Sequence, residues 1–403
     1  MPPTSLTRRL GLGDAVFLGL GSMIGAGVFA AFAPAARAAG AGLLIALVLA
    51  AVVAYCNAMS SARLAAIHPE SGGTYVYGRE RLGEFWGYLA GWGFVTGKTA
   101  SCAAMTLTVV AYAAPGLGQP WRSLLAVAVV AALTAVNYFG VHRSALATRV
   151  IVSCTLLVLT VAGVAMAAGP SGGGPLVAWP GGGGVLEAAG LLFFAFAGYA
   201  RLATLGEEVR DPARTIPRAI PLALGVTLVV YAALAVLLLV RLGPAALAAS
   251  PDPIAAAVPG WLAPVVRAGA AIAALGSLLA LILGVSRTTL AMSRDGHLPR
   301  FLAAVHPRYR VPHRAELAVG LVVAVLAATI DLRAAIGFSS FAVLTYYAIA
   351  NAAALTLKGK ARAVLGLTGC VVLAFSLPLP SVLAGCAVLS LGGLAYGVRR
   401  VRR

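Results

Sequence analysis

The chain has 403 residues, of which 61% are hydrophobic and only 10% are charged. Soluble domains carry roughly 25% charged residues, so this composition excludes an ordinary soluble fold and indicates lipid as the solvent. The formal net charge is +18, but the basic residues lie in short segments between apolar runs. They are therefore expected to orient the chain in a membrane rather than to bind nucleic acid.

Uncharged runs of about 18 residues or more, which are long enough to cross a bilayer, recur along the chain. We predict an all-α membrane protein that forms a single domain over residues 1–403, without a soluble domain. A glycine-rich, uncharged segment at about 169–184 separates the first five spans from the others. Twelve transmembrane helices are expected at about 12–36, 41–66, 84–114, 122–140, 146–168, 185–207, 216–241, 262–292, 315–330, 332–357, 361–377 and 380–398.

The lysine and arginine residues test this number of spans. If the spans alternate from an inner N-terminus, most of the 30 basic residues fall on the inner side. Adding or removing one span would place basic loops on both sides of the membrane. The positive-inside rule therefore favours a multi-pass protein of the cell membrane with both termini in the cytoplasm.

The first expected span contains a glycine-rich stretch from Gly19 to Phe29. Each glycine costs a helix about 1 kcal/mol relative to alanine, so a break is expected near the middle of the membrane. A break frees backbone polar groups, which lipid does not tolerate unless they line a polar cavity. The alternative is a continuous helix in which Gly21 and Gly25 form a GxxxG packing face.

The sixth expected span favours the break, because Gly198 lies about halfway across it. Spans one and six would be corresponding members of two five-span halves that run in opposite directions. Glycine-interrupted helices at matching positions are a sequence indicator of a transporter binding site. Their half-helix N-termini would offer N–H groups to a substrate carboxylate. The pattern therefore predicts a secondary transporter.

Three motifs resemble those of the amino acid–polyamine–organocation (APC) permeases. These are Gly-Ser-Met-Ile-Gly-Ala-Gly-Val-Phe at 21–29, Phe-Phe-Ala-Phe-Ala-Gly at 193–198 with the following segment 207–220, and Ser286-Arg287 with Ala-Met-Ser-Arg-Asp-Gly-His-Leu-Pro at 291–299. The resemblance covers nearly the whole chain. It implies an inverted five-plus-five repeat, LeuT-like, with repeats at 1–168 and 185–357 and two further helices at 361–398. It also implies an amino acid or amine as substrate.

The resemblance also implies a substrate site. Ser22, Gly25, Ala26 and Gly27 would bind the carboxylate, whereas Phe196, Ala197 and Gly198 would accept the amino group through freed carbonyls. We include Met23, Ile24 and Tyr199 of the same segments. The sequence departs from the family pattern at two positions: Ala200 stands where members that recognise a long cationic side chain carry an acid, and Thr155 stands where several proton-coupled members carry a lysine.

Two basic residues, Lys98 and Arg201, fall inside expected spans. An intramembrane lysine is costly and indicates function, so Lys98 is our candidate for the proton-coupling group, and its ammonium is expected to bond carbonyls freed at the first-helix break. A structural lysine that bonds backbone carbonyls is the alternative. Arg201 is expected to steer an anionic group or to close the inner gate with Glu207 or Glu208, or to be a structural arginine whose charge reaches the interface. The acidic residues, Glu316 among them, are expected in or beside loops. Thr155, Ser277 and carbonyls near Gly21 would form at best a weak sodium site, because all are neutral oxygens.

These features predict a secondary active transporter that moves amino acids across the cytoplasmic membrane by proton-coupled uptake. The alternative is an ion-independent exchanger of amino acids or amines. An enzyme is not expected, because no cluster of catalytic side chains occurs, and neither a metal site nor a Walker motif is visible. The expected partners are a small-molecule substrate, the proton and the lipid bilayer, with no cofactor and no nucleic acid.

Overall fold

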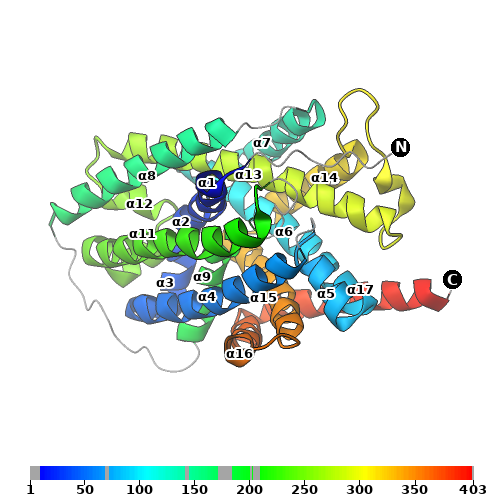
Figure 1. The fold of residues 1–403 in the computed structure, drawn as a ribbon. Helices are drawn as coiled ribbons and strands as arrows, with labels where there is room; N and C mark the ends of the chain where they lie inside the picture. The colour runs from blue at the N-terminus through cyan, green and yellow to red at the C-terminus, as the bar shows by residue number, and fades with distance from the viewer. Residues whose placement is uncertain are drawn as a thin grey trace.

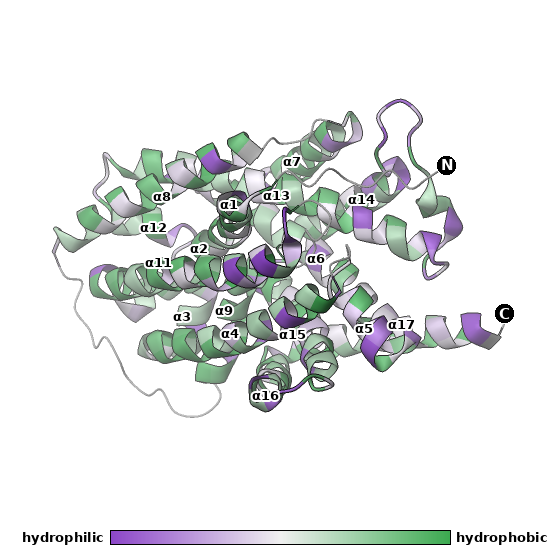
Figure 2. Cartoon of the chain, in the orientation of Figure 1, coloured by the Kyte–Doolittle hydropathy of each residue, from purple (hydrophilic) through white to green (hydrophobic). Residues whose placement is uncertain are grey.

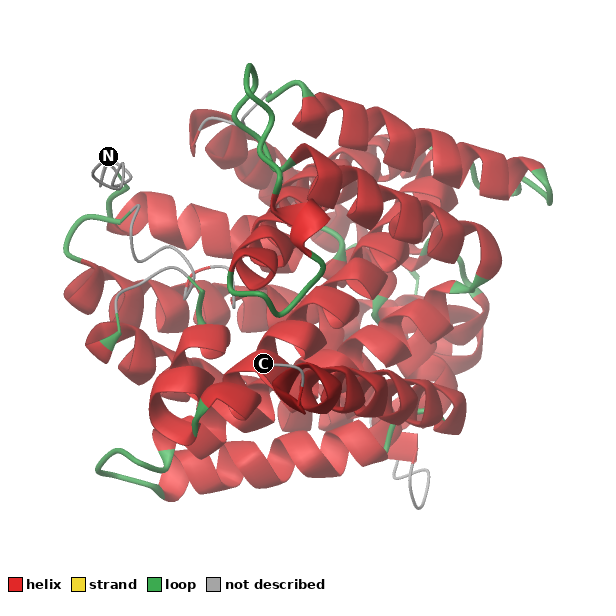
Figure 3. Cartoon of the chain, turned by 90° about the vertical axis from the view of Figure 1, so that its right-hand side faces the viewer, coloured by secondary structure: helices red, strands yellow, loops and turns green. Residues whose placement is uncertain are grey.

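The computed structural model describes residues 10–68, 72–140, 145–170, 184–199, 202 and 209–401. Across these residues the regular structure is helical (Figure 3). The β-type pairing in the described chain is one isolated parallel bridge between Leu10 and Val209. The predicted all-α class is confirmed. The expected loop at 169–184 falls largely on residues outside this description.

The helices follow the chain in the order shown in Figure 1. Their bounds are α1 Leu12–Ile24, α2 Gly27–Ala30, α3 Phe32–Ala39, η1 Gly40–Gly42, α4 Leu43–Ile67, α5 Thr74–Leu82, α6 Glu84–Ala113, α7 Trp121–Tyr138, α8 Ala145–Ala167, α9 Gly184–Phe196, η2 Ala197–Tyr199, α11 Pro212–Ala249, α12 Pro253–Ala257, α13 Ala263–Arg294, η3 Arg300–Ala303, α14 His313–Thr329, α15 Leu332–Ala354, α16 Ala361–Phe375 and α17 Leu379–Val401.

Nine helical runs of the described chain are long and apolar enough to cross a membrane, and two shorter apolar helices accompany them. The chain is therefore a multi-pass membrane protein. One of the nine runs, Phe32–Ile67, contains both α3 and α4. Gly40 separates these two helices with a φ of +52°, a conformation that glycine adopts without strain. Helices lie at all twelve predicted spans, and the number that cross the membrane stays a prediction.

Two predicted bounds differ from the structure around α11. The helix is longer than the expected span 216–241, because α11 begins at Pro212 and ends at Ala249. Proline is tolerated in the first turn of a helix, where its missing N–H has no intrahelical acceptor. At the other end Gly243, with a φ of +71°, kinks the helix instead of ending it. The short helices α5 and α12 were not expected.

α6 occupies the centre of the bundle. It packs against α5, α13, α14 and α15, and 89% of the residues in its most apolar 18-residue stretch are buried. In the most apolar 18-residue stretches of α7 and α17 only 22% of the residues are buried, so those two helices lie at the periphery. Hydrophilic residues gather toward the end of the bundle that holds α5, the segment before α14 and the C-terminal end of α17 (Figure 2). Because α6 is central and largely buried, a polar side chain in the middle of this helix faces the protein interior.

Candidate functional site

The first helix is interrupted at Gly25 and Ala26, between α1 and α2. Gly25 has a ψ of −82°, which ends the regular α1 helix. A Cβ atom on Gly25 would lie 1.6 Å from Ser277 Oγ of α13, so no side chain fits at this position. The structure therefore contains the break that the glycine-rich motif predicted, and α13 fills the space beside it.

The second interruption follows α9, where the α-helix changes into the 3₁₀ turn Ala197–Tyr199. It lies directly against the first interruption. A Cβ atom on Gly198 would be 2.3 Å from the carbonyl oxygen of Ser22, and one on Gly27 would be 2.7 Å from Ala195 Cα. Glycine at both positions lets the two backbones touch, which residues with a Cβ would prevent.

Side chains from neighbouring helices bond carbonyl oxygens in and beside the two interruptions. Ser277 Oγ donates to the oxygen of Gly21 at 2.8 Å. Tyr231 OH of α11 is 2.7 Å from the oxygen of Met23 and 3.1 Å from that of Ala195, so one hydroxyl lies against both broken helices. These donors satisfy backbone acceptors that lipid could not.

Lys98 of α6 belongs to this group of donors. Its side chain is buried, and its Nζ donates to the carbonyl oxygen of Ala197 at 3.2 Å. Tyr347 OH of α15 is 3.4 Å from the same oxygen, and the Tyr347 ring stacks on Tyr199 with centroids 4.9 Å apart. One charged and one neutral donor therefore share a single carbonyl of η2.

The partner of Lys98 corrects a detail of its expected role. We expected its ammonium to bond carbonyls freed in the first helix, whereas the observed hydrogen bond goes to η2, after α9. α6 contacts both α2, after the first interruption, and η2, at the second. The position of Lys98 in the sequence did not indicate which of the two its side chain reaches.

All ten residues expected to bind substrate lie in the two interruptions or in the turn beside them. Ser22 Oγ bonds within its own helix, to the oxygen of Leu18 at 2.9 Å. The apolar members are no more than 2% exposed, apart from the glycines: Met23, Ile24, Ala26, Phe196, Ala197 and Tyr199. The described state therefore holds the two segments closed against each other. Their role in binding stays a proposal, which is developed below.

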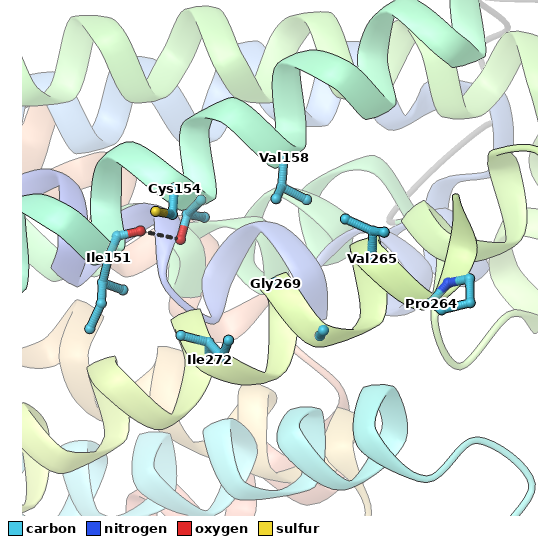
Figure 4. A pocket seen from close by; sticks show the side chains of 9 residues that line it. Ile151, Cys154, Val158, Pro264, Val265, Gly269 and Ile272 are labelled. Carbon is cyan, nitrogen blue, oxygen red and sulfur yellow. Dashed lines mark hydrogen bonds between the residues drawn. The ribbon is translucent and has the colours of Figure 1, made fainter. Parts of the chain in front are cut away.

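Two of the candidate sodium ligands meet, because the Ser277 hydroxyl lies 2.8 Å from the carbonyl oxygen of Gly21. Thr155 Oγ1 donates to the oxygen of Ile151 in its own helix, whereas the single hydroxyl proton of Ser277 has two alternative acceptors, the oxygens of Gly21 at 2.8 Å and of Ala273 at 3.1 Å. Thr155 instead lines an apolar groove of about 440 Å³ between α8 and α13 (Figure 4). The groove is lined by Ile151, Cys154, Thr155, Val158, Pro264, Val265, Ala268, Gly269 and Ile272.

Sodium is therefore not expected to drive transport. The visible oxygens are neutral and already donate or accept bonds within the protein, so a hard cation gains little by binding there. Replacing sodium with potassium on both sides of a liposome membrane should leave the initial rate of substrate uptake unchanged. A severalfold loss of that rate in potassium would contradict this expectation.

Arg201, Ala200, Glu207 and Glu208 lie outside the described residues, so the proposed inner gate remains a prediction. Two functional candidates, Tyr231 and Tyr347, were not found from the sequence. For Tyr231 the available signal was a tyrosine in the middle of an otherwise aliphatic stretch, because a buried tyrosine hydroxyl needs a hydrogen-bond partner.

Comparison with known proteins agrees with these features. The family model described as amino acid permease matches residues 10–392. An uncharacterized transporter of Mycobacterium tuberculosis (strain ATCC 25618 / H37Rv) is 66% identical over 416 residues, covering 99% of this chain and 93% of the relative. The branched-chain amino acid permease BcaP of Bacillus subtilis (strain 168) is 29% identical, and the match covers 88% of this chain and 82% of that protein.

A plant relative is similar over most of this chain. The vacuolar cationic amino acid transporter 4 of Arabidopsis thaliana is 31% identical, and the match covers 82% of this chain and 60% of that protein. The resemblance to APC permeases is thereby confirmed, and these relatives carry the names of transporters or permeases rather than of enzymes. The chain belongs to the amino acid permease family.

Proposed function

We propose that this protein is a secondary active transporter of amino acids whose substrate binds between the two helix interruptions. The observation that supports this most is the direct contact between them, where Gly198 lies against the Ser22 carbonyl. Backbone groups at helix breaks are polar groups at membrane depth, and they suit the carboxylate and the amino group that all amino acids share. Binding would require the closed segments to separate.

The proposed architecture has twelve spans, an inverted repeat of five plus five helices and both termini in the cytoplasm of a cell-membrane protein. α1 with α2, and α9 with η2, would be the first helices of the two repeats. Their interruptions meet at one place, as the repeat relation requires. Labelling of single cysteines placed at the two ends, from either side of intact cells, tests the orientation.

The substrate class is proposed to be an amino acid without a long cationic side chain. Ala200 stands after the second interruption, where an acid would be expected for a cationic substrate. The side chains around the interruptions are apolar and aromatic, such as Met23, Ile24 and Phe196. Among the relatives, one is named for branched-chain amino acids and another for cationic amino acids, so the proposal rests on Ala200 and on the apolar side chains.

Lys98 is proposed as the proton-coupling residue. It is a titratable side chain in the interior, and it bonds the second interruption directly. Loss of its proton would remove the positive charge from the bond to Ala197 and so bias one facing of the carrier over the other. Such a difference in affinity between two states is what coupling requires.

Purified protein in liposomes tests the proposed function. We expect labelled neutral amino acids to accumulate when the outside is acidified, and to accumulate less when a proton ionophore removes the gradient. Uptake that requires internal amino acid and ignores the gradient would favour the ion-independent exchanger. Absence of both uptake and exchange for all common amino acids in folded protein would contradict the assignment.

A further inference from the structure

Glu316 is buried, and among the described residues it has no hydrogen-bond partner. It lies in the first turn of α14 and is 0% exposed, and neither carboxyl oxygen forms a hydrogen bond with the described part of the chain. The sequence placed this residue in or beside a loop, and its position in the first turn of α14 agrees with that expectation; the structure adds that the side chain is buried. An ionised carboxylate without donors is strongly disfavoured in a buried position, and such a group is neutralised instead.

Another buried acid shows the contrast. Asp252 is 5% exposed, but its carboxylate accepts a hydrogen bond of 2.8 Å from Arg267 Nε. A paired arginine of this kind compensates the buried negative charge. Asp252 is therefore a matched example of a buried carboxylate with an arginine partner, whereas Glu316 has no such donor among the described residues.

Among the described residues, the charge of Arg287 acts on Glu316 directly. α14 packs against α6, α7, α13 and η3, and the positive charge of Arg287 on α13 favours the ionised form of Glu316. The Arg287 side chain is itself exposed. Other titratable or charged groups toward this end of these elements are Tyr138, Arg294, Arg300, His306, His313 and Arg314.

We propose that Glu316 is a proton-binding site at the interface of α13 and α14. It is neutral in the closed packing described here, and it loses its proton when this interface loosens and Arg287 can approach. This site is additional to Lys98 and does not depend on the role proposed for that lysine. Its ligand is the proton itself.

Packing connects Glu316 to the helix interruption. Val319 and Val323, which follow it along α14, belong to the same apolar cluster as Ala26 of the first interruption. Cys102, one turn after Lys98 on α6, is part of this cluster as well. A movement of α14 is therefore transmitted by direct contacts to the proposed substrate site, as coupling between two sites requires.

Carbodiimide labelling of the purified wild-type protein tests the site without any substrate. Dicyclohexylcarbodiimide is apolar and adds to protonated carboxyl groups, so the modified peptide gains the mass of the reagent. At mildly acidic pH we expect Glu316 to be modified and Asp252 to remain unmodified, and modification of Glu316 should fall severalfold at mildly alkaline pH. Glu316→Gln should remove this modification.

Three results of the labelling would overturn the proposal. These are an unmodified Glu316 at acidic pH in folded protein, equal modification of Glu316 and Asp252, or modification of Glu316 that does not change with pH. Each of these labelling results depends on the Glu316 carboxyl group alone. The labelling therefore tests the proton site even if the protein does not transport amino acids.

Transport provides the second measurement. Glu316→Gln keeps the neutral shape of the side chain, so substrate exchange should become insensitive to pH and match the wild type at acidic pH. Glu316→Asp keeps a titratable carboxyl and should retain a pH response. If Glu316→Gln and the wild type show the same pH profile of exchange, the proton site lies elsewhere.

Discussion

Replacing Lys98 with methionine is expected to abolish accumulation driven by a pH gradient while exchange of substrate remains measurable. Methionine is similar in length but lacks the amine that donates to the Ala197 carbonyl. Loss of a charge-assisted hydrogen bond costs about 1.5–3 kcal/mol, which corresponds to about a ten- to hundredfold change in an equilibrium. Tyr347 can still donate to the same oxygen, so the second interruption should keep its structure.

The measurement is uptake into liposomes with and without an imposed pH gradient, together with exchange against internal substrate. Lys98→Arg retains the positive charge at all accessible pH values and should hold the carrier in one facing. Lys358→Met, which removes an exposed lysine, is the matched control. If Lys98→Met accumulates substrate as well as the wild type, Lys98 is structural and another group carries the proton.

The helices and the two interruptions were accessible from the sequence because their signals are local. Apolar runs of sufficient length predict spans, and glycines in the middle of two such runs predict breaks. Gly25 and Gly198 are both at positions where the structure leaves no room for a Cβ atom. The length of α11 was less accessible, since Gly243 and Pro244 favour a helix end before them, whereas α11 continues through a kink at Gly243.

The partners of the buried polar groups were not accessible, because they depend on packing between distant segments. Lys98 bonds a carbonyl 99 residues away, and every residue in the chain carries such an acceptor. Glu316 resembles an interfacial acid in sequence because it follows His313 and Arg314. Only the arrangement of the helices around α14 shows that it is buried and lacks donors. The pattern of apolar residues therefore predicts the arrangement of helices better than it predicts the hydrogen-bond partners of buried polar side chains.

Substitution of Gly198 by leucine is expected to abolish substrate binding in protein that still inserts and folds. Even the first atom of a new side chain would lie 2.3 Å from the Ser22 oxygen, so the two interruptions must move apart. Because binding already requires these segments to separate, the loss is expected from the bulk of the leucine side chain, which would fill the proposed site between them. A cost of about 3 kcal/mol corresponds to about a hundredfold loss of affinity.

Gly25→Leu should have the same effect, because its Cβ would lie 1.6 Å from Ser277 Oγ. Gly225→Leu is the control, since that glycine is exposed on α11 and its Cβ would meet nothing within 4 Å. The measurement is equilibrium binding of labelled amino acid to purified protein whose elution profile and helicity match the wild type. If folded Gly198→Leu and Gly25→Leu bind substrate with unchanged affinity, the substrate does not lie between the two interruptions. If only the Gly225 control binds normally, the contact between the broken helices is where recognition takes place.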